Sequence, residues 1–534
     1  NAVGYKAYPD NLIEKFVDKS WENGIDIFRI FDSLNWVKAM EPSIKYVRNT
    51  NGALAEAAIS YTGNILDKNQ TKYNLNYYTQ LAKDLENAGA HIIALKDMAG
   101  LLTPYAATEL IGALRDTVKL PIHLHTHDTS SLQSATYLKA IEANVDVIDV
   151  ALGGLSGLTS QPNFNSIVEM MKYHERSHDF DISKLNQFSN YWEDIREYYY
   201  PFESGLKSGT AEVFQHEIPG GQYSNLRPQA DALGLGARFD EVKIMYAKVN
   251  TMFGNLVKVT PSSKVVGDMA IFMVTNNLTP EDVMENGEEI SFPDSVIDFF
   301  KGDLGQPVGG FPKKLQQIIL KNQKPYKNRP NAHLEPIDFE AAYQAFTKKY
   351  QKGFTRAIEF EDFLSYSLYP RVFDQAHENY KKYGNLAILP TINFFYGMKL
   401  QEEAIIELEP GKVIIVKLLS VSSSNEEGMR TVFFKINGEN RFVEVHDKSL
   451  DIKKVENIKA DENNSDEIGS PLQGLLYKVL VKKGQELKEN DPIFIIEAMK
   501  METTVTAIRD CKVKSLQLKE GEMVMQDDLI LTVE

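Results

Sequence analysis

The sequence is poor in cysteine and has no long hydrophobic run. Cys511 is the single cysteine among 534 residues. One thiol cannot form a disulfide within the chain, so we expect a reducing compartment, the cytoplasm of a bacterial-type cell. No apolar stretch approaches the roughly 18 residues of a membrane-spanning helix, and no targeting segment is visible. We therefore expect no membrane partner.

Basic residues are fewer than acidic ones. The chain carries 58 Lys and Arg against 74 Asp and Glu, a formal net charge of −16. Because nucleic-acid binding needs a basic face and no basic stripe is present, we expect no nucleic-acid partner. The length predicts about three or four domains. The chain opens at Asn1 directly into patterned sequence, and we expect it to be a piece of a longer protein.

Short β-rich runs alternate with amphipathic helical stretches in the first third of the chain. The expected strands are Ile25–Phe31, Ala53–Tyr61, His91–Asp97, Ile122–His127 and Asp146–Leu152. The helical stretches between them include Leu75–Ala88, Pro104–Thr117 and Ser131–Ala143. This alternation predicts right-handed βαβ units and a buried parallel sheet.

Polar residues decide between the two α/β folds that this alternation allows. Asp32, Lys96-Asp97 and His125–Asp128 all stand at the C-terminal ends of expected strands, where (β/α)8 barrels place their chemistry. No Gly-rich phosphate loop follows an expected strand, which disfavours a doubly wound dinucleotide-binding sheet. We therefore predict an α/β fold with a (β/α)8 TIM barrel. Five of its eight strands are visible, and we expect the missing ones to precede Asn1.

His125 and His127 are the best candidates for metal ligands. Residues i and i+2 on a strand point to the same side, so both imidazoles can bind one divalent cation. A structural role for the pair is equally compatible with this spacing. His123 continues the alternation and is assigned to the core. Lys96, on a neighbouring strand, becomes a ligand only as a carbamate, and a salt bridge to Asp97 is the simpler interpretation.

The C-terminal region contains an internal repeat. Residues 476–497 and 513–534 align with Gly484 on Gly521, at an offset of 37 residues since 521 − 484 = 37. Each half alternates apolar and polar residues and turns at a Lys-Gly or Glu-Gly pair. The repeat predicts a small flattened β-barrel with quasi-two-fold symmetry.

A lysine lies between the two halves of this repeat. Lys500 is the centre of the string Glu497-Ala498-Met499-Lys500-Met501. The string resembles the biotin attachment signature of biotin-dependent carboxylases, which implies covalent biotin on Lys500. A Met-flanked surface lysine in a strand is the alternative interpretation.

Further blocks along the chain carry a more specific resemblance. They are NAVGY (Asn1–Tyr5) with YPDN (Tyr8–Asn11), FRIFDSLN (Phe28–Asn35), LKDMAGLL (Leu95–Leu102), HLHTHDT (His123–Thr129), GLTSQP (Gly157–Pro162), PGGQYSNL (Pro219–Leu226) and VTPSSKVVGD (Val259–Asp268). These blocks resemble the carboxyltransferase region of the pyruvate carboxylase family. FFYGMK (Phe394–Lys399) and GMRTVFFKINGENR (Gly428–Arg441) resemble a later, linking domain of the same family.

The resemblance, together with composition, implies a domain order. Residues 1–204 would be the barrel without its N-terminal strands, and residues 205–390, which are helix-rich, a helical funnel over its mouth. Residues 391–456 would be a linking, allosteric β domain. Residues 457–469 are acidic and lack aromatics, which predicts a flexible linker. Residues 470–534 would be the biotin carboxyl carrier, or biotinyl, domain.

The resemblance also implies a metal centre. Lys96 would be an N6-carboxylysine that takes part in catalysis and binds the metal together with His125 and His127. The family's remaining ligand, an aspartate on the first barrel strand, has no counterpart from Asn1 onward. Mn, Zn or Mg would suit imidazole and carboxylate-like ligands.

Other residues would bind substrate and biotin. Tyr5 and Asp32 would help to form the substrate pocket, and Ser263 and Lys264 would line the access path for biotin. Thr260 would be the catalytic hydroxyl that shuttles a proton. Without the resemblance, a threonine directly before a proline is typical of a helix N-cap.

One stretch departs from the family pattern beside the metal candidates. Ser130-Ser131-Leu132-Gln133 follows the HDT motif, where the family usually has Ser-Gly-Asn-Gly. Two turn glycines are replaced by residues that resist positive φ, so we expect the loop next to His127 to differ in shape. The segment Ala151–Leu155 also departs from the usual sequence of the family.

The implied activity is transfer of the carboxyl group of carboxybiotin to pyruvate, which gives oxaloacetate for gluconeogenesis and anaplerosis. Two alternatives stay open: a carboxyltransferase subunit of an oxaloacetate decarboxylase or transcarboxylase, and an inactive biotin-carrier fragment. No ATP-binding module is visible, so a biotin carboxylase domain is expected upstream or on another chain. Biotin protein ligase and further copies of the chain, as a homotetramer, are the other expected partners.

Overall fold

The computed structural model describes residues 2–4, 6–203, 205–354, 356–425, 428–447, 457–461, 464–498 and 501–534. The chain divides into two compact units. One comprises Asn1–Glu193, Phe202–Asp338 and Asn457–Glu534, and the other comprises Asp194–Pro201 and Phe339–Glu456. Tyr5 and Lys500, the candidates for substrate and biotin, lie outside the described residues. In the described part, no helix is long and apolar enough to cross a membrane.

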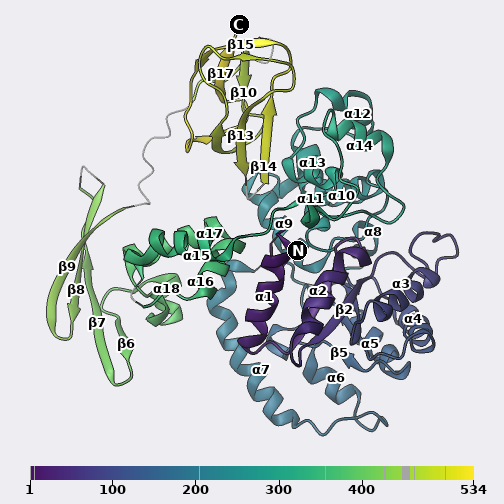
Figure 1. Ribbon diagram of the computed structural model, residues 1–534. Helices are drawn as coiled ribbons and strands as arrows, with labels where there is room; N and C mark the ends of the chain where they lie inside the picture. The colour runs from purple at the N-terminus through teal and green to yellow at the C-terminus, as the bar shows by residue number, and fades with distance from the viewer. Residues whose placement is uncertain are drawn as a thin grey trace. The chain divides into compact units, whose positions relative to one another are not determined.

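Five parallel strands form the sheet that positions the candidate site (Figure 1). They are β1 (Ile27–Phe31), β2 (Leu54–Ser60), β3 (Ile92–Asp97), β4 (Ile122–Thr126) and β5 (Val147–Ile148). Each strand pairs with the next one in sequence, in the order β1-β2-β3-β4-β5. Right-handed crossovers between consecutive neighbours place the connecting helices on one face, as in a barrel wall. The expected α/β fold with five parallel strands is confirmed.

Strand β5 is shorter than the predicted Asp146–Leu152, because the chain changes its partner. Val147 and Ile148 pair with β4. Ala151 instead forms a parallel bridge with Asn163, farther along the chain. The segment after Asp149, whose N–H still donates to Leu124 of β4, therefore leaves the ladder of β4.

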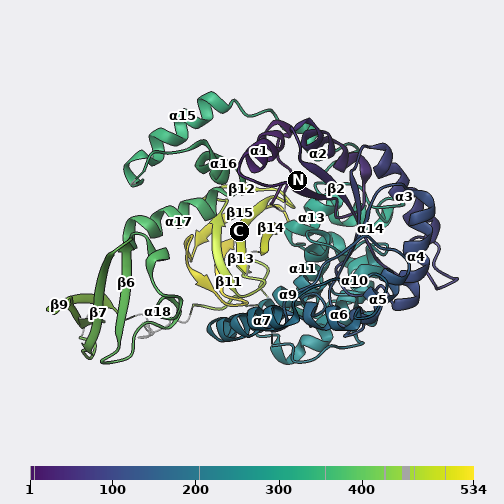
Figure 2. The same cartoon turned by 90° about the horizontal axis from the view of Figure 1, so that it is seen from below.

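Amphipathic helices pack against the sheet (Figure 2). They are α1 (Asp10–Glu22), α2 (Val37–Asn49), α3 (Leu75–Asn87), α4 (Pro104–Thr117) and α5 (Gln133–Glu142). Their apolar sides form one core with the strands, in which Ile44, Tyr78, Leu110 and Tyr137 are fully buried. The side chain of Asn74 caps α3 by accepting a hydrogen bond from the backbone N–H of Tyr77, as polar N-cap residues do. The three predicted helices are confirmed to within two residues.

In the described part of this unit, nine further α-helices follow the sheet. They are α6 (Phe164–Met170), α7 (Ile182–Arg196), α8 (Val213–His216), α9 (Gly220–Ala232), α10 (Phe239–Met252), α11 (Ser262–Thr275), α12 (Pro280–Asn286), α13 (Asp294–Lys301) and α14 (Lys313–Leu320). Helix α11 is apolar on all sides and buried along its length except at Lys264 and Thr275, which is typical of a central core helix. Its N-terminal end carries Thr260, Ser263 and Lys264.

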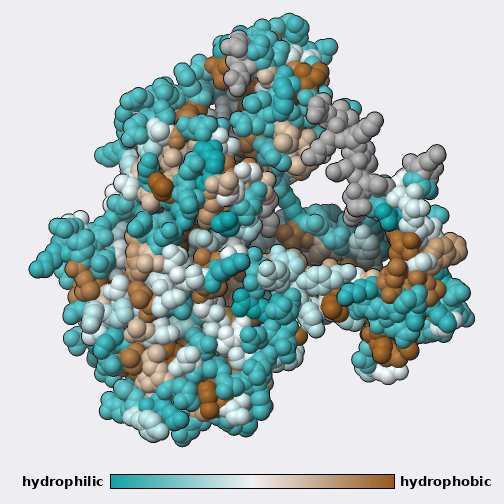
Figure 3. All heavy atoms as spheres, turned by 180° about the vertical axis from the view of Figure 1, so that it is seen from behind, coloured by the Kyte–Doolittle hydropathy of each residue, from teal (hydrophilic) through white to brown (hydrophobic). Residues whose placement is uncertain are grey.

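The second unit combines helices with an antiparallel sheet. The helices are α15 (Phe339–Tyr350), α16 (Phe360–Leu368), α17 (Pro370–Tyr383) and α18 (Thr391–Tyr396), and the strands are β6 (Glu403–Glu409), β7 (Lys412–Val421), β8 (Met429–Ile436) and β9 (Glu439–His446). The unit begins again at Phe339, inside the stretch 205–390 that the sequence assigns to one helical funnel. This sheet has exposed apolar side chains, among them Ile405 and Phe442. Figure 3 shows brown patches on this part of the chain.

Two four-stranded antiparallel sheets form the C-terminal domain. Their strands are β10 (Glu467–Gly469), β11 (Gly474–Val479), β12 (Glu486–Leu487), β13 (Pro492–Ala498), β14 (Met501–Thr506), β15 (Cys511–Leu516), β16 (Met523–Val524) and β17 (Leu529–Val533). The sheet orders are β10-β17-β15-β12 and β14-β13-β11-β16, so each half of the repeat contributes to both sheets. The expected repeat is confirmed: β11, β12 and β13 recur as β15, β16 and β17, with 511 − 474 = 37 and 529 − 492 = 37.

The N-terminal border of this domain lies earlier than the sequence suggests. Strand β10 pairs with β17, although its residues belong to the stretch 457–469 that composition predicts as a flexible linker. Lys459 also forms a bridge with Asp528. The polar composition hides these contacts because backbone pairing at a sheet edge does not require apolar side chains.

Candidate active site

Strands β3 and β4 bring Lys96, His125 and His127 together. Lys96 is the register partner of His125, and His127 follows β4 at its carboxyl end. His125 Nε2 and His127 Nε2 lie 3.3 Å apart. Two nitrogens that each stand about 2.0–2.1 Å from a tetrahedral cation are about 3.4 Å apart. The histidine pair therefore has the spacing of two ligands to one metal ion.

Hydrogen bonds at the opposite ring nitrogens determine which nitrogens face each other. His127 Nδ1 lies 2.6 Å from the carbonyl oxygen of Thr159, which can only accept, so Nδ1 carries the proton. His125 Nδ1 lies 2.7 Å from Asp149 Oδ2, a carboxylate oxygen that likewise accepts. With its Nδ1 engaged in this way, each ring directs its Nε2 toward the other. When both Nε2 atoms are unprotonated, they offer two lone pairs to one cation, so the residues present fit a metal ion.

The protonation state of His127 suits a ligand. Burial, together with the nearby His125 and Lys96, lowers the pKa of His127 to about 4. The ring is therefore neutral near pH 7, which is the form that binds metals.

Lys96 is half-buried beside an aromatic ring. Its Nζ lies 3.7 Å from the ring centroid of Phe31. Burial and the positive charge of Arg29 lower the pKa of Lys96 to about 8, so a substantial share of the amine is neutral near pH 7.5. The neutral amine is the form that can add CO2 and become a carbamate.

Asp97 is not the partner of Lys96. Its two carboxylate oxygens accept hydrogen bonds from the backbone N–H groups of Leu101 and Leu102 and from Thr126 Oγ1, at 2.8–2.9 Å. The salt bridge between Lys96 and Asp97, the simpler interpretation of the sequence, is therefore wrong: in the described part of the chain Asp97 instead holds the loop that follows β3.

A network of charged side chains adjoins the histidine pair, and the sequence interpretation missed most of it. Arg29 of β1 forms ion pairs with Glu56 of β2 and, at 3.0 Å, with Asp149 after β5. His123 lies between the two carboxylates, 2.8 Å from Glu56 and 2.9 Å from Asp149. His123 is buried, as predicted, but its partners are charged. A detectable signal was present: Arg29 and Glu56 are lone charges in otherwise apolar strands, and such charges require partners.

The network shifts the titration of its members strongly. Burial lowers the pKa of His123, but hydrogen bonds and charges from Asp149 and Glu56 outweigh burial and raise it to about 9. For the carboxylates, burial opposes ionisation and would raise the pKa. The interactions of Asp149 with His123, His125 and Arg29 nevertheless hold its pKa below the usual range. Those of Glu56 with His123 and Arg29 do the same for its pKa. Near pH 7 the network therefore contains two negative and two positive charges.

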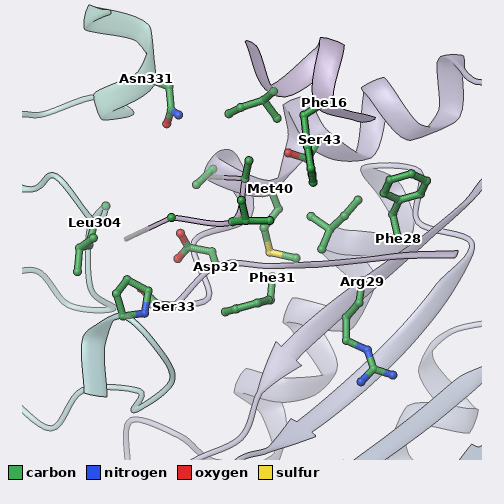
Figure 4. Close-up of a pocket in the computed structure, with 18 of the residues that line it drawn as sticks. Phe16, Phe28, Arg29, Phe31, Asp32, Ser33, Met40, Ser43, Leu304 and Asn331 are labelled. Carbon is green, nitrogen blue, oxygen red and sulfur yellow. The ribbon is translucent and has the colours of Figure 1, made fainter. Parts of the chain in front are cut away.

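Asp32 and Thr260 border a separate cavity of about 340 Å³ (Figure 4). Phe16, Phe28 and Met40 contribute apolar walls, and Figure 4 shows Arg29 directed away from Asp32. Asp32 Oδ1 accepts hydrogen bonds of 2.9 Å from the backbone N–H groups of Leu34 and Trp36. Burial nevertheless raises the pKa of Asp32 to about 6, against the effect of these two bonds.

Thr260 does not cap a helix. Helix α11 begins at Ser262, its N-cap is Pro261, and no side chain caps it. The hydroxyl of Ser262 donates instead to the carbonyl oxygens of Val257 and Val259, at 2.8 and 2.7 Å. The N-cap interpretation of Thr260 is therefore wrong, and its side chain is left to the cavity.

The two residues expected near biotin lie in the first turn of α11. Ser263 is fully buried, and its hydroxyl has no hydrogen-bond partner among the described residues. Lys264 pairs with Asp268, a fully buried carboxylate that also accepts a 2.7 Å hydrogen bond from Ser295. The sequence interpretation did not identify Asp268 and Ser295 as partners of this lysine.

The unusual loop after His127 keeps a turn despite lacking glycine. Ser131 adopts a left-handed backbone with φ 61°. Gln133 is fully buried and donates from Nε2 to the carbonyl oxygen of Gly100 over 2.8 Å, which ties this loop to the one after β3. The side chain that replaces a family glycine thus joins the loops that follow β3 and β4.

Three family descriptions match the chain. "HMGL-like" matches residues 25–191, "Conserved carboxylase domain" matches residues 213–417, and "Biotin-requiring enzyme" matches residues 466–533. Pyruvate carboxylase of Bacillus subtilis is 51% identical over 534 residues, and the human mitochondrial enzyme is 41% identical over 537 residues. The chain spans 46% and 45% of these two proteins, less than half of their length.

Solved structures agree with these matches. The carboxyl transferase domain of Rhizobium etli pyruvate carboxylase is 48% identical, with a TM-score of 0.79, over 84% of this chain and 74% of that one. The complete multifunctional enzyme from Rhizobium etli has the same identity and TM-score, over 44% of its chain. The chain therefore belongs to the pyruvate carboxylase family, of which it spans the carboxyltransferase and biotin-carrying part.

Proposed function

We propose that the chain transfers the carboxyl group carried by biotin to pyruvate and so forms oxaloacetate. The observation that carries the proposal is the pair of Nε2 atoms of His125 and His127, 3.3 Å apart beside the half-buried Lys96. This arrangement fits a divalent cation at the carboxyl edge of a barrel sheet, where such enzymes bind substrate. The similarity to pyruvate carboxylases, and to a Rhizobium etli domain solved with pyruvate and biocytin, supports pyruvate and biotin as the reactants.

His125, His127 and Lys96 would hold the metal, which we expect to be Mn, Zn or Mg. No group of three His, Cys, Asp or Glu side chains in the described part is arranged to hold a metal. Lys96 as a carbamate would supply the oxygen ligand that the two imidazoles lack. Bound there, a divalent cation supplies Lewis-acid stabilisation for the charge that develops on the pyruvate oxygen when the methyl group loses a proton.

Thr260 would move that proton between the pyruvate methyl carbon and the ureido nitrogen of biotin. Its hydroxyl borders the same cavity as Asp32, which with Tyr5 would bind the substrate. Threonine is a weak base, so the transfer depends on close positioning of both reactants. The cavity has apolar walls beside Asp32 and Thr260, and Ser263 and Lys264 would receive the biotin carried on Lys500.

The remaining half of the overall reaction would depend on partners. A biotin carboxylase domain would load the carboxyl group at the expense of ATP, and biotin protein ligase would attach biotin to Lys500. We expect assembly as a homotetramer in the cytoplasm, as the family resemblance implies.

The substitution Thr260→Ala tests the proposed role of Thr260. We expect the rate of biotin-dependent oxaloacetate decarboxylation, the reverse reaction, to fall by about 10²–10⁴, the usual contribution of a positioned proton-transfer group. Biotin incorporation at Lys500, followed by mass spectrometry, should not change. Thr251→Ala is a matched control, because among the described residues that hydroxyl bonds only the carbonyl oxygen of Ala247 on α10. Wild-type turnover by Thr260→Ala would refute the proton-transfer role.

A further inference from the structure

The backbone of Asp149 is fixed on both sides by residues of neighbouring elements. Its N–H donates to the carbonyl oxygen of Leu124 in β4 over 3.2 Å. Its carbonyl oxygen accepts a 2.6 Å hydrogen bond from the hydroxyl of Tyr137 in α5. That hydroxyl, from a fully buried side chain, also accepts from the N–H of Thr126. The point from which the Asp149 carboxylate projects is therefore rigid.

The carboxylate of Asp149 contacts three side chains from two strands. Oδ2 lies 2.7 Å from His125 Nδ1 and 3.0 Å from Arg29 Nη1. Oδ1 lies 2.9 Å from His123 Nε2. Rotating the carboxylate away from His125 would break the contacts with Arg29 and His123 as well.

Glu56 closes this network into a ring. It accepts from Arg29 Nε and lies 2.8 Å from His123 Nδ1. Glu56 is 3% exposed, so water does not readily replace these contacts. Arg29 and His123 each bridge the two carboxylates, and neither can turn away without leaving a buried charge unpaired. The ring therefore holds the Asp149 carboxylate in one orientation.

The two candidate metal ligands are oriented by different means. His127 is held by the backbone carbonyl of Thr159, which no substitution removes, whereas His125 depends on a side chain. We propose that Asp149 is a positioning residue for the metal site: it keeps the proton of His125 on Nδ1, so that the lone pair of Nε2 faces the cation. The ring of Arg29, Glu56 and His123 holds Asp149 in place for this purpose. The inference rests on the metal site of the proposed function.

Cobalt titration of the whole chain tests the inference without an activity assay. Metal-free protein in bicarbonate buffer is titrated with Co²⁺ against a competing chelator, and bound metal is followed by visible absorption. Asp149→Asn leaves His125 one neutral amide oxygen and replaces the acceptor at His123 or at His125 by an NH2 group. We expect it to weaken Co²⁺ binding by about 10–100-fold, the usual effect of changing the carboxylate partner of a metal-binding histidine. Asp146→Asn is the matched control, because Asp146 bonds Arg115 and the N–H of Ile122 but not a histidine. Its affinity should stay within about twofold of the wild type, well below that effect.

The outcomes separate this inference from the proposed function. Wild-type protein that binds no Co²⁺ would refute the metal site itself. Wild-type affinity in a folded Asp149→Asn variant would refute only the positioning role. If that variant does not fold, the tautomer decides: long-range ¹H–¹⁵N spectra of histidine-labelled wild type should show His125 protonated at Nδ1. Protonation at Nε2 in the metal-free protein would overturn the inference.

Discussion

Two carboxylate clusters in this protein titrate in opposite directions. In the ring of Arg29, Glu56, His123 and Asp149, the pKa of both carboxylates is lowered, because each accepts hydrogen bonds from two cationic side chains. Around the cavity and α11, burial raises the pKa of Asp32 and of Asp268, although Asp32 accepts backbone hydrogen bonds and Asp268 pairs with Lys264. Burial acts on all four groups, so the number of cationic partners accounts for the difference.

The contrast indicates what each region does. The ring balances its own charges. It acts on the metal candidates through the hydrogen bond that Asp149 accepts from His125 and through the charge of Arg29 near Lys96. The cavity side has raised pKa values and a buried, unpartnered Ser263 hydroxyl among the described residues. Polar groups left incompletely compensated are a common feature of binding sites. We therefore expect the ring to be a scaffold and the cavity side to complete its interactions only with ligands.

Among the substitutions around the cavity and α11, removal of Lys264 should cause the largest loss of stability. In Lys264→Met the fully buried Asp268 retains only the hydrogen bond from Ser295. We expect a loss of about 3 kcal/mol in the free energy of unfolding, as for other half-broken buried ion pairs. Urea denaturation followed by tryptophan fluorescence and circular dichroism measures it.

A double-mutant cycle separates stability from biotin binding at this position. Lys264→Met combined with Asp268→Asn removes the uncompensated charge, so most of the lost stability should return. The biotin-dependent rate should stay low if Lys264 also contacts biotin. Recovery of both would leave Lys264 with a structural role only, and recovery of neither would contradict the pairing with Asp268.

The raised pKa of Asp32 predicts a smaller, pH-dependent effect. Its pKa is about 6 in the folded chain, whereas the ordinary value for an aspartate is 3.8. The folded state therefore binds the proton more tightly, and the stability that this contributes is lost as pH rises through 6. Between pH 5 and pH 8 the wild type should lose about 1–1.5 kcal/mol more than Asp32→Asn, which keeps an oxygen acceptor for Leu34 and Trp36.

Thermal unfolding of both proteins at the two pH values measures this difference. Parallel curves for wild type and Asp32→Asn would show that the carboxylate is solvated and its pKa ordinary. Asp32→Asn should also lower the carboxyl-transfer rate. A buried carboxylate that lowers stability when it is charged is typical of a residue that acts in function.

The sequence predicted the sheet well because buried strands are marked by local composition. Runs such as Ala53–Tyr61 are apolar on both faces and end in polar residues, and their order in the sheet follows from right-handed crossovers. Strand β5 was overestimated because the change of partner at Ala151 involves Asn163, a contact that local pattern does not encode. Likewise, the start of the second unit at Phe339 depends on tertiary packing, not on composition.

The site was only partly predictable for a related reason. His125 and His127 share a strand, so their common direction follows from the two-residue period. Arg29, Glu56 and Asp149 come from three different places along the chain, and their meeting depends on the register of β1 with β2 and on the end of β5. Thr260 was recognisable only by resemblance, because a lone hydroxyl before proline has a commoner structural explanation.

The smallest expected effect concerns the loop after His127. Ser131 has a φ of 61°, a backbone conformation that costs a non-glycine residue about 1 kcal/mol or more. Glycine avoids this cost, but it loses more conformational entropy on folding, which cancels part of the gain. We therefore expect Ser131→Gly to raise the free energy of unfolding by about 0.5 kcal/mol. Ser131→Ala, which keeps the backbone cost, is the matched control and should bring no gain. Because Gln133 still ties this loop to Gly100 in both variants, cobalt affinity should not change, and a change would show that the loop itself positions His127.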